Sequence, residues 1–352
     1  MNTLNGKSRY LPIFSNYNIE NGEKGELNMK KQKIIPSLLM MGLIMAVSPS
    51  IFSVSASSGY GGGSGTESDP YLNSTPEHLN QLQLDVNVNK IDTSGKYYQL
   101  VNDIDLTNFD SDDNESNGNF TPIGYRNDST DYGYFKGTFD GNGNTISNLE
   151  IILPEQNYVG LFGYNYCANV RNVGVENVLV EGKTYVGGLV GYQYNGAITQ
   201  SYVVGNVTGS SDYVGGLVGY QYYGAINQSN ATGNVSGNYN IAGLVGYQNR
   251  GTIAQSYATG DVAGVDCIGG LVGGQSGTIS QSYATGEVNG SSKYVGGLVG
   301  SQSGGTISQS YATGNVSKSD YYSYVGGLIG FQADSSSKIS QSYATGGGKR
   351  KW

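Results

Sequence analysis

The sequence contains few of the residues that most catalytic and metal-binding sites use. Its 352 residues include one histidine, His78, and two cysteines, and no H-E-x-x-H pattern of a zinc peptidase occurs. Zinc sites of the histidine type and Ser–His triads both depend on correctly placed imidazoles. With a single histidine, both kinds of site are effectively excluded within this chain.

Charge is also scarce, whereas glycine is abundant. Charged residues make up 13% of the chain, and there are 56 glycines but 7 prolines. This share of charge is about half of that in an ordinary domain, and the composition is not typical of a disordered tail. It predicts a folded chain with many turns and close approaches of the backbone.

The segment 29–56 indicates an export signal. It has a basic start, an apolar stretch over Ile34–Val47 and the small-residue ending Val54-Ser55-Ala56, which is typical of a secretory signal cleaved after Ala56. The apolar stretch is too short to span a bilayer comfortably, and without a cysteine a lipid-anchored lipoprotein is not expected. Because a signal should begin a chain, we interpret residues 1–28 as an over-called gene start.

The predicted location is therefore extracellular or on the cell surface. Cleavage would remove 6 basic and 3 acidic residues and leave 13 basic and 24 acidic ones, a net charge of −11. A strongly acidic protein is repelled by nucleic acids and by anionic membranes. We therefore expect neither as a partner, and no membrane span in the mature chain.

The next segments predict a linker and a capping region. Residues 57–65, SSGYGGGSG, have the composition of a flexible linker. Residues 66–156 are expected to form an N-terminal cap and the first coils of a larger β-structure. Within them, Thr75 is a suitable helix N-cap followed by Pro76, so we expect a short helix over 76–84. Such a helix would cover an open sheet edge, which would otherwise invite aggregation.

Two acidic segments resemble calcium loops to different degrees. Asp140 opens the sequence DGNGN, but an EF-hand needs glycine and glutamate where Thr145 and Ile151 stand, so we interpret this segment as a turn. The loop over 110–115 is a better candidate, because four carboxylates lie close together in the sequence. Its candidate Ca²⁺ ligands are Asp110, Asp112, Asp113 and Glu115. The alternative is a solvated acidic loop, and no other cofactor is expected.

From residue 157 to residue 346 the chain repeats one unit. A Gly-Leu-apolar-Gly core begins at seven glycines separated by 28, 28, 27, 27, 27 and 30 residues, and SYATGNV or a variant recurs between the cores. Each unit contains about three short alternating runs, and none has helical periodicity. Such units cannot bury a core alone, but they can when stacked. The predicted fold is therefore all-β, a right-handed parallel β-helix (β-solenoid) with coils of about 27 residues.

Stacking in register predicts columns of equivalent side chains. One leucine per coil should fill the interior: Leu161, Leu189, Leu217, Leu244, Leu271, Leu298 and Leu328. Two glutamine columns, which begin at Gln193 and Gln200, should hydrogen-bond along the stack. A tyrosine column interrupted by Asn230 should face outward, because its smaller neighbours, such as Ser201 and Val203, alternate with it and should face inward. Its members are Tyr202, Tyr257, Tyr283, Tyr311 and Tyr343.

The phrases VGGLVG and SYATGNVSG resemble the GLUG repeat of secreted bacterial surface proteins. The segments SDPYLNSTPEHLNQL, NDIDLT, TPIGY and GTFDGNGNTISNL resemble the region that precedes such repeats. The resemblance covers about 157–346 in seven copies and implies an adhesin-like architecture. Some members of this family carry an attached peptidase, but no catalytic residue belongs to the repeat itself, so none is assigned to this chain.

The leading functional interpretation is a non-enzymatic surface protein that binds a host or environmental glycan or protein. A repeated outer face supplies many equivalent weak contacts, which suits multivalent binding. The tyrosine column is the candidate binding site, because aromatic rings pack against sugars, although stacking that stabilises the sheet is the stronger explanation of it. The alternative is a structural stalk, or a fragment of a larger surface protein.

A second functional class is a polysaccharide-active enzyme, since parallel β-helices commonly carry such activities. Asp261 and Glu287 occupy equivalent positions on adjacent coils, where their carboxylates would lie about 5 Å apart, as in retaining glycosidases. Isolated substitutions on a solvated face explain this pair better.

The register also predicts the state of the cysteines and of the C-terminal end. Cys167 and Cys267 should lie four coils, or about 19 Å, apart, beyond the reach of a disulfide, so both should be free thiols. After residue 346 the repeat predicts NVSG, but a basic tail, 347–352, stands there instead. We interpret the tail as a truncation and expect the bare last coil to associate end to end with other copies.

Overall fold

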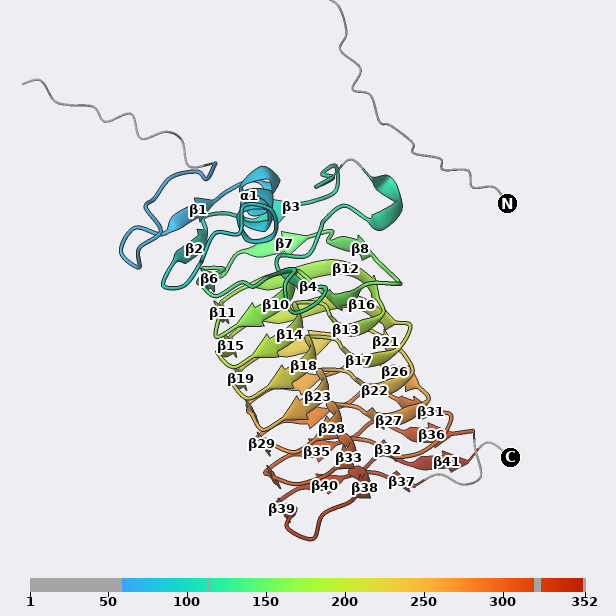
Figure 1. Cartoon of the computed structure of the whole chain (residues 1–352). Coiled ribbons are helices and arrows are strands. Elements are labelled where there is room, and N and C mark those ends of the chain that lie inside the picture. Colours follow the sequence, from blue (N-terminus) through green and yellow to red (C-terminus); the bar gives the residue numbers. More distant parts are fainter. Residues whose placement is uncertain (1–58, 113, 320–323, 351–352) are drawn as a thin grey trace, which may run out of the picture. The chain divides into compact units, whose positions relative to one another are not determined.

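Short parallel strands, each paired with its counterpart one repeat away, build the molecule. The structure is a computed structural model that describes residues 59–350 apart from 113 and 320–323. These residues belong to one unit, Val54–Trp352. The segments interpreted as an over-called gene start and an export signal, 1–28 and 29–56, lie outside the described residues. The coils stack on one another along one axis, from the blue end of the ribbon to the red end (Figure 1).

Each complete coil passes through four sheets, which we number I to IV. Along the chain, a coil crosses them in the order IV, II, I and III. Sheet I has ten strands, which mark about ten turns of a parallel β-solenoid. Its strands are β1 (Tyr71–Asn73), β2 (Tyr97–Leu100), β6 (Thr138–Asp140), β11 (Asn169–Arg171), β15 (Ala197–Thr199), β19 (Ala225–Asn227), β24 (Thr252–Ala254), β29 (Thr278–Ser280), β34 (Thr306–Ser308) and β39 (Lys338–Ser340).

Sheets II and IV have seven strands each. Sheet II contains β10 (Phe162–Tyr166), β14 (Val190–Tyr194), β18 (Val218–Tyr222), β23 (Val245–Asn249), β28 (Val272–Gln275), β33 (Val299–Gln302) and β38 (Ile329–Gln332). Sheet IV contains β9 (Asn157–Val159), β13 (Thr184–Gly187), β17 (Asp212–Gly215), β22 (Tyr239–Ala242), β27 (Asp266–Gly269), β32 (Val295–Gly296) and β37 (Val325–Gly326).

Sheet III has fifteen strands, because most coils cross it in two short pieces. These are β3 (Ile104–Asp105), β7 (Thr145–Ser147), β8 (Glu150–Ile152), β12 (Gly174–Gly182), β16 (Tyr202–Gly209), β20 (Asn230–Thr232), β21 (Val235–Ser236), β25 (Tyr257–Ala258), β26 (Val262–Gly264), β30 (Tyr283–Ala284), β31 (Val288–Gly290), β35 (Tyr311–Ala312), β36 (Val316–Lys318), β40 (Tyr343–Ala344) and β41 (Gly348–Arg350). A separate antiparallel hairpin joins β4 (Tyr125–Arg126) to β5 (Tyr132–Gly133).

The register explains why one apolar phrase recurs. From residue 157 onward, partners lie 26 to 32 residues apart, so that each sheet places the same kind of side chain on itself, as in Ile253 on Ile279. Sheet I contributes a column of isoleucines, while sheets II, III and IV contribute columns that are mainly valine. Most of these side chains are fully buried, and burying each contributes about 1.5–3 kcal/mol. The predicted all-β solenoid is therefore confirmed.

The predicted leucine column lies in this interior. Six of its members, from Leu161 to Leu298, are completely buried. Leu328 is the exception: it is half-buried and packs against the edge of the core, because no further coil among the described residues covers it. Leu328 thus belongs to the predicted column but is less buried than its other members.

The glycine before each leucine permits a close approach between coils. A Cβ atom on Gly216 would lie 2.2 Å from the carbonyl oxygen of Gly243 on the next coil and 2.9 Å from the Cβ of Ala231. Neither atom is the end of a flexible side chain that could move aside. Only glycine, which has no Cβ, therefore fits where the two coils approach at this point.

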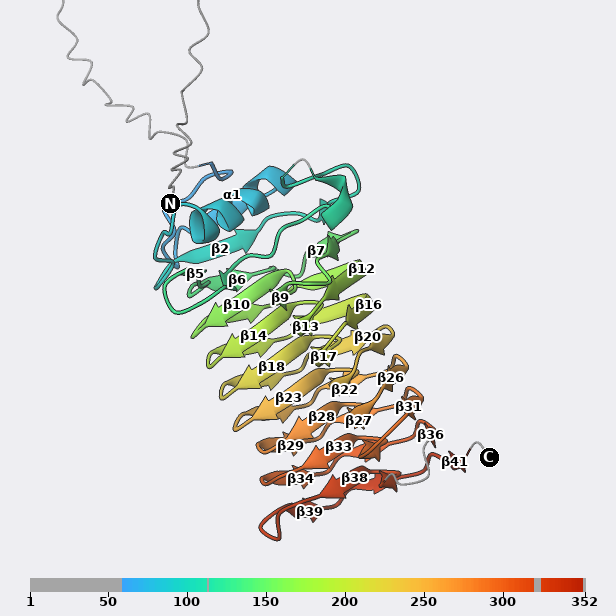
Figure 2. The same ribbon diagram turned by 45° about the vertical axis from the view of Figure 1, so that its right-hand side comes forward.

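The N-terminal end of the stack is covered by helix α1 (Pro76–Asn87), which lies across the first coils (Figure 2). As predicted, Thr75 is its N-cap and accepts a hydrogen bond from the backbone N–H of His78. The helix is three residues longer than the predicted 76–84, because Val86 continues the buried stripe of Leu79 and Leu82.

The described part of the predicted linker is instead folded. Tyr60 is 8% exposed, stacks on Tyr71 at 4.7 Å and donates a hydrogen bond of 2.8 Å to Asp85 of α1. The backbone N–H of Gly61 donates to Leu72. A single aromatic anchor in a glycine-rich segment was enough to dock it, so the linker prediction is wrong for residues 59–65.

A buried serine ladder follows the corner between sheets I and III. The backbone N–H of Ser229 donates to the Oγ of Ser256 at 3.2 Å, and that hydroxyl donates to the carbonyl of Ala254 at 2.7 Å. The same pair of bonds recurs on other coils. Because the serines at 201, 229, 256, 282 and 310 are completely buried, each hydroxyl satisfies backbone groups that water cannot reach.

The two glutamine columns do not form the predicted amide ladders. Gln193 to Gln302 are buried, but the amide of Gln248 donates to the carbonyl of Thr278 at 3.2 Å rather than to another glutamine. The second column lies at an exposed corner, where Gln255 adopts a left-handed conformation with φ 51°. In the first column, four buried amides donate to backbone carbonyls of the same or the next coil, whereas the second column faces solvent.

The predicted basic tail partly continues the sheet. Gly348–Arg350 forms β41, which pairs with β36 in register, because backbone pairing does not require the valine that the repeat would have supplied. Residues 351 and 352 lie outside the described residues.

Core and surface substitutions should therefore have unequal effects. Leu244→Asp places an unpaired charge between two buried leucines and should lower the free energy of unfolding by about 4 kcal/mol or more. Tyr257→Ser on the outer surface should cost about 1 kcal/mol. Urea denaturation followed by circular dichroism compares the two, and equal losses would mean that the two faces are reversed.

The serine ladder predicts a second difference. Ser256→Ala leaves the buried N–H of Ser229 without its acceptor and should lower the free energy of unfolding by about 1–3 kcal/mol. Ser291→Ala is the matched control, because Ser291 is exposed and its hydroxyl bond of 3.3 Å is at the surface; its effect should stay within about 0.5 kcal/mol. Equal midpoints for both variants in urea would contradict a stabilising ladder.

Candidate functional site

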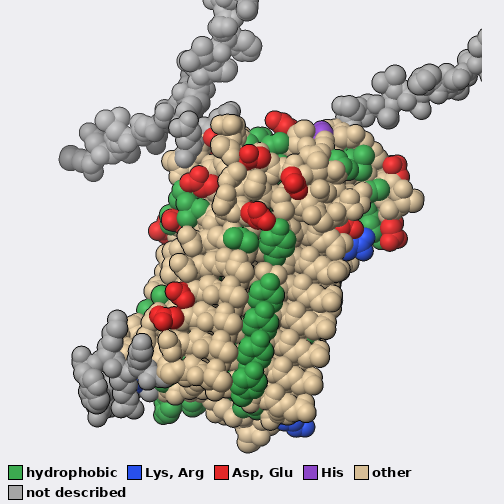
Figure 3. Space-filling view, turned by 180° about the vertical axis from the view of Figure 1, so that it is seen from behind, with side chains coloured by type: hydrophobic (Ala, Val, Ile, Leu, Met, Phe, Trp, Pro, Cys, Tyr) green, Lys and Arg blue, Asp and Glu red, His purple; other side chains and the backbone are tan. Residues whose placement is uncertain are grey.

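The predicted tyrosine column lies on the outer surface of sheet III. The rings of Tyr257, Tyr283, Tyr311 and Tyr343 stack at centroid separations of 4.9, 5.0 and 5.3 Å, with interplanar angles of 4–8°. A hydrophobic stripe runs down the corresponding face of the solenoid (Figure 3). We call these four residues the tyrosine stripe. Their small neighbours face inward, so the predicted outward orientation is confirmed.

Tyr202 is separated from the stripe. In the register it pairs with Asn230, which in turn pairs with Tyr257. The Tyr202 hydroxyl donates to Glu176 at 2.7 Å. Burial, followed by the contact with Glu176, raises the pKa of Tyr202 to about 12, so that its phenol stays protonated and bound to Glu176.

The stacking limits how the stripe could bind a ligand. Each inner ring has a neighbour on both faces, so these faces are not available to a sugar ring. The edges and hydroxyl groups remain, and within the described part of the chain none of the four hydroxyls has a protein hydrogen-bond partner. A ligand would therefore meet a row of phenol hydroxyls, which both donate and accept hydrogen bonds.

A second and larger tyrosine surface was not predicted. It covers sheet II and the adjoining corner of sheet IV in the N-terminal half, and we call it the tyrosine face. It has three columns of stacked rings: Tyr158, Tyr185 and Tyr213; Tyr164, Tyr192, Tyr220 and Tyr247, with Tyr134 tilted against Tyr164; and Tyr166, Tyr194 and Tyr222. The signal was present in the phrase YVGGLVGYQY, which carries a tyrosine at three positions.

The columns of the tyrosine face support one another. Stacked rings within a column lie 4.7–5.3 Å apart, whereas Tyr185 meets Tyr192 of the next column edge to face at 86°. The first column sits at a corner where Tyr185 has φ 60°. Burial raises the pKa of Tyr185 to about 12, so its hydroxyl is a hydrogen-bond donor at neutral pH.

Only Asp110 and Asp112 of the four predicted calcium ligands have described side chains, so the calcium site stays a prediction. Asp110 lines a hollow of about 340 Å³ with Phe109 and Glu150, whereas Asp112 lines a different hollow of about 260 Å³. The Asp112 carboxylate accepts hydrogen bonds from Asn117 at 3.0 Å and Thr121 at 3.4 Å. Asp113 lies outside the described residues, as does the side chain of Glu115, and no three acidic, histidine or cysteine side chains converge among those described.

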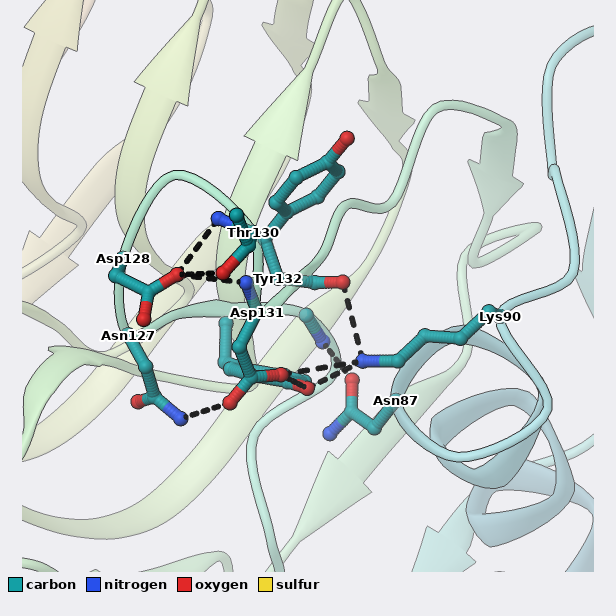
Figure 4. Close-up of polar contacts among 9 residues, drawn as sticks. Asn87, Lys90, Asn127, Asp128, Thr130, Asp131 and Tyr132 are labelled. Atoms are coloured by element: carbon teal, nitrogen blue, oxygen red, sulfur yellow. Dashed lines mark hydrogen bonds and ion pairs between the residues drawn. The ribbon is translucent and has the colours of Figure 1, made fainter.

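The second hollow is bounded by hairpin β4–β5 and the end of α1, and a polar network holds this wall (Figure 4). Asn127 donates to Asp131 at 2.7 Å, and Lys90 donates to the carbonyl of Tyr132 at 3.1 Å. Tyr125 donates to Asp131 through a short hydrogen bond. The hydrogen bonds from Tyr125, which has the larger effect, and from Asn127 hold the pKa of Asp131 below its usual value. Asp131 therefore stays charged at neutral pH.

The acidic pair considered for catalysis belongs to a surface ladder. The backbone N–H of Glu287 donates to the Asp261 carboxylate at 2.8 Å, and that of Asp261 donates to Asn234 at 3.2 Å. Asn234 in turn donates to Asn206. Asp261 thus takes the place of an asparagine as an acceptor for the next coil, which accounts for its position without catalysis.

Sequence comparison identifies the repeat. The profile of the family described as "The GLUG motif" matches residues 182–208, 210–236, 237–263, 264–289 and 291–317. The β-solenoid therefore contains five GLUG repeats. The sequence predicted seven copies over 157–346. The profile matches five of them, and the structure shows coils of the same kind on both sides.

Two curated proteins are similar to parts of the chain. Halomucin of Haloquadratum walsbyi is 39% identical over 126 residues, 36% of this chain. A protein of Evansella cellulosilytica named as a Gly-rich membrane protein is 38% identical over 107 residues, 30% of this chain. The matches span 1% and 11% of these two relatives.

A crystal structure from Bacteroides ovatus, described as an immunoglobulin A1 protease, aligns over 83% of this chain and 80% of its own, with 23% identity and a TM-score of 0.49. In the described part of the GLUG chain, no helix is long and apolar enough to cross a membrane.

The two cysteines are free, as predicted, and differ in environment. Cys167 is exposed and Cys267 is half-buried. Burial, followed by the nearby Asp266, raises the pKa of Cys267 to about 12. Since the thiolate is the reactive form, Cys267 should be nearly inert at neutral pH.

We therefore expect two phases in a thiol titration of the folded protein. Cys167 should react with a maleimide at once at pH 8, whereas Cys267 should react slowly and faster as the pH approaches 12, because its thiolate fraction rises. Both should react at once in denaturant. Cys167→Ser and Cys267→Ser assign the phases, and an equally fast Cys267 in the folded state would refute the assignment.

Proposed function

We propose that this GLUG solenoid is a non-enzymatic surface module that binds an extended polymer, most readily a glycan, through its repeated tyrosine hydroxyls. The observation that carries the proposal is the tyrosine stripe, in which equivalent hydroxyls recur once per coil and have no hydrogen-bond partner among the described residues. Coils are about 4.8 Å apart, and an extended chain of β-linked sugars advances by a comparable distance per unit. Many weak contacts could then add along the polymer.

Further observations support this function over an enzyme. Among the described residues, the acidic pair that suggested catalysis is explained by the surface ladder, and no metal-binding cluster assembles. Neither printed name of the two curated relatives, Halomucin and a Gly-rich membrane protein, is that of an enzyme. Export through the segment 29–56 would deliver the acidic mature chain to the cell exterior, where such polymers occur.

The alternative is a structural stalk, and the same stacked rings favour it, because they stabilise the sheet whether or not a ligand is present. A stalk needs the rings but not their hydroxyl groups. End-to-end association through the last coil, where Val325 and Ile339 are 38% and 43% exposed, would suit either function.

Removing the hydroxyls alone separates these functions. Tyr283→Phe combined with Tyr311→Phe keeps both rings, so the unfolding midpoint should be unchanged. Binding to polysaccharides on a glycan array and by isothermal titration calorimetry should weaken by about fivefold to thirtyfold, because two hydrogen bonds are lost.

The control is Tyr283→Ala with Tyr311→Ala, which should lose both stability and binding. Wild-type binding that the phenylalanine variant retains in full would assign the stripe to structure. A wild-type protein that binds no polysaccharide on the array would refute the glycan proposal itself.

A further inference from the structure

The hollow beside hairpin β4–β5 has the features of a small-ligand site. It measures about 260 Å³ and is lined by side chains of the cap and of the first coils, among them Asn117, Tyr125, Asn127, Gln156, Asn157 and Tyr158. We call it the Tyr158 pocket. It is small for a ligand site, with room for one sugar unit rather than for an oligosaccharide.

The lining indicates the chemistry of the ligand. The charged residue in it is Asp112, whose carboxylate already accepts from Asn117 and Thr121, and no lysine or arginine is among the lining residues. An anionic ligand would therefore find no cation in the lining itself; the cation that acts on Tyr158 is Arg126 of β4, outside that lining. Carboxamides predominate instead, and each offers both donors and an acceptor, which suits vicinal hydroxyl groups.

Tyr158 supplies the pocket with an aromatic ring face, which the inner rings of the stacked columns lack. It is the first ring of its column: Tyr185 stacks on one side at 4.9 Å and 15°. Its other ring contacts, with Tyr164 and Tyr192, are tilted or edge-on. One face of the ring is therefore not stacked, and the residue lines the pocket.

Hydrogen-bonding groups lie next to this ring in the chain. Gln156 and Asn157 are exposed, and no hydrogen bond of either side chain is formed within the described part of the protein. The opposite wall is fixed, because Asn87 donates to the carbonyl of Pro122 at 2.8 Å and accepts from the N–H of Gly124 at 2.8 Å. Together with the network around Asp131 (Figure 4), this fixes that wall before binding, so that the ordering cost falls mainly on Gln156 and Asn157.

We propose that the Tyr158 pocket binds one neutral sugar unit, with the sugar ring on Tyr158 and its hydroxyls on Gln156 and Asn157. The pocket rests on the proposed glycan-binding function and locates a second, single-unit site for it. It lies at the N-terminal end of the tyrosine face, on a different wall from the stripe, so the two sites can be tested separately.

The test uses monosaccharides and their methyl glycosides, which are too short to bridge successive hydroxyls of the stripe. Ligand-observed NMR on the folded chain identifies the sugars that bind, and titration gives their affinities. Tyr158→Ala should weaken binding by about fivefold to tenfold through loss of the ring, whereas Tyr158→Phe should retain it. Gln156→Ala with Asn157→Ala should weaken binding by a similar factor.

Tyr213→Ala is the matched control, because Tyr213 occupies the same left-handed corner two coils away, with φ 61° against 63° for Tyr158, and does not line the pocket. Its sugar affinity should equal that of the wild type, and melting curves should show that both alanine variants are folded.

The outcomes distinguish the pocket from the stripe. Monosaccharide binding that is lost in Tyr158→Ala but kept in the stripe's phenylalanine variant supports the pocket whatever the stripe does. Polysaccharide binding without any monosaccharide binding, or monosaccharide binding that Tyr158→Ala leaves intact, overturns the pocket and leaves the proposed function standing. A charged sugar bound in preference to neutral ones would also overturn it.

Discussion

In-register parallel pairing is the constraint on which the rest of this structure depends. Because each strand lies against its own counterpart one coil away, every side chain meets a near-copy of itself at the strand spacing of about 4.8 Å. Apolar residues then build continuous interior columns. A polar residue must either be able to bond to the next coil, as the serines do, or face solvent.

The same constraint creates the surface chemistry. A single tyrosine position in the repeat becomes a stack of rings, and a single asparagine position becomes a ladder of acceptors that an aspartate can join. Stacking removes ring faces from solvent and leaves edges and hydroxyls, so repetition favours hydrogen bonding along a polymer. An open ring face arises where a column begins, and at Tyr158 it coincides with a pocket formed by the cap.

The buried glutamine amides show that not every interior polar atom finds a hydrogen-bond partner on the next coil. Oε1 atoms of Gln221, Gln248, Gln275 and Gln302 are buried without a protein partner, while the Nε2 atoms bond to turn carbonyls. Burying such groups is costly, and the position is nonetheless kept as glutamine from coil to coil. The helix and the docked segment around Tyr60 solve a related problem at the N-terminal end, where they cover the first coils.

The sequence by itself determined the solenoid, its period, the leucine column and the outward side of the tyrosine stripe, because all of these follow from one repeated pattern. It also predicted the N-cap at Thr75 and the two free cysteines. Only the tertiary structure decided where non-repeating parts meet: that Tyr60 docks on Asp85, that Asp110 and Asp112 face different hollows, and that Tyr158 borders a pocket. In the repeats, the number of residues between two positions fixes how many coils apart they lie. The cap has no repeat, so its contacts depend on packing between segments whose separation the sequence does not encode.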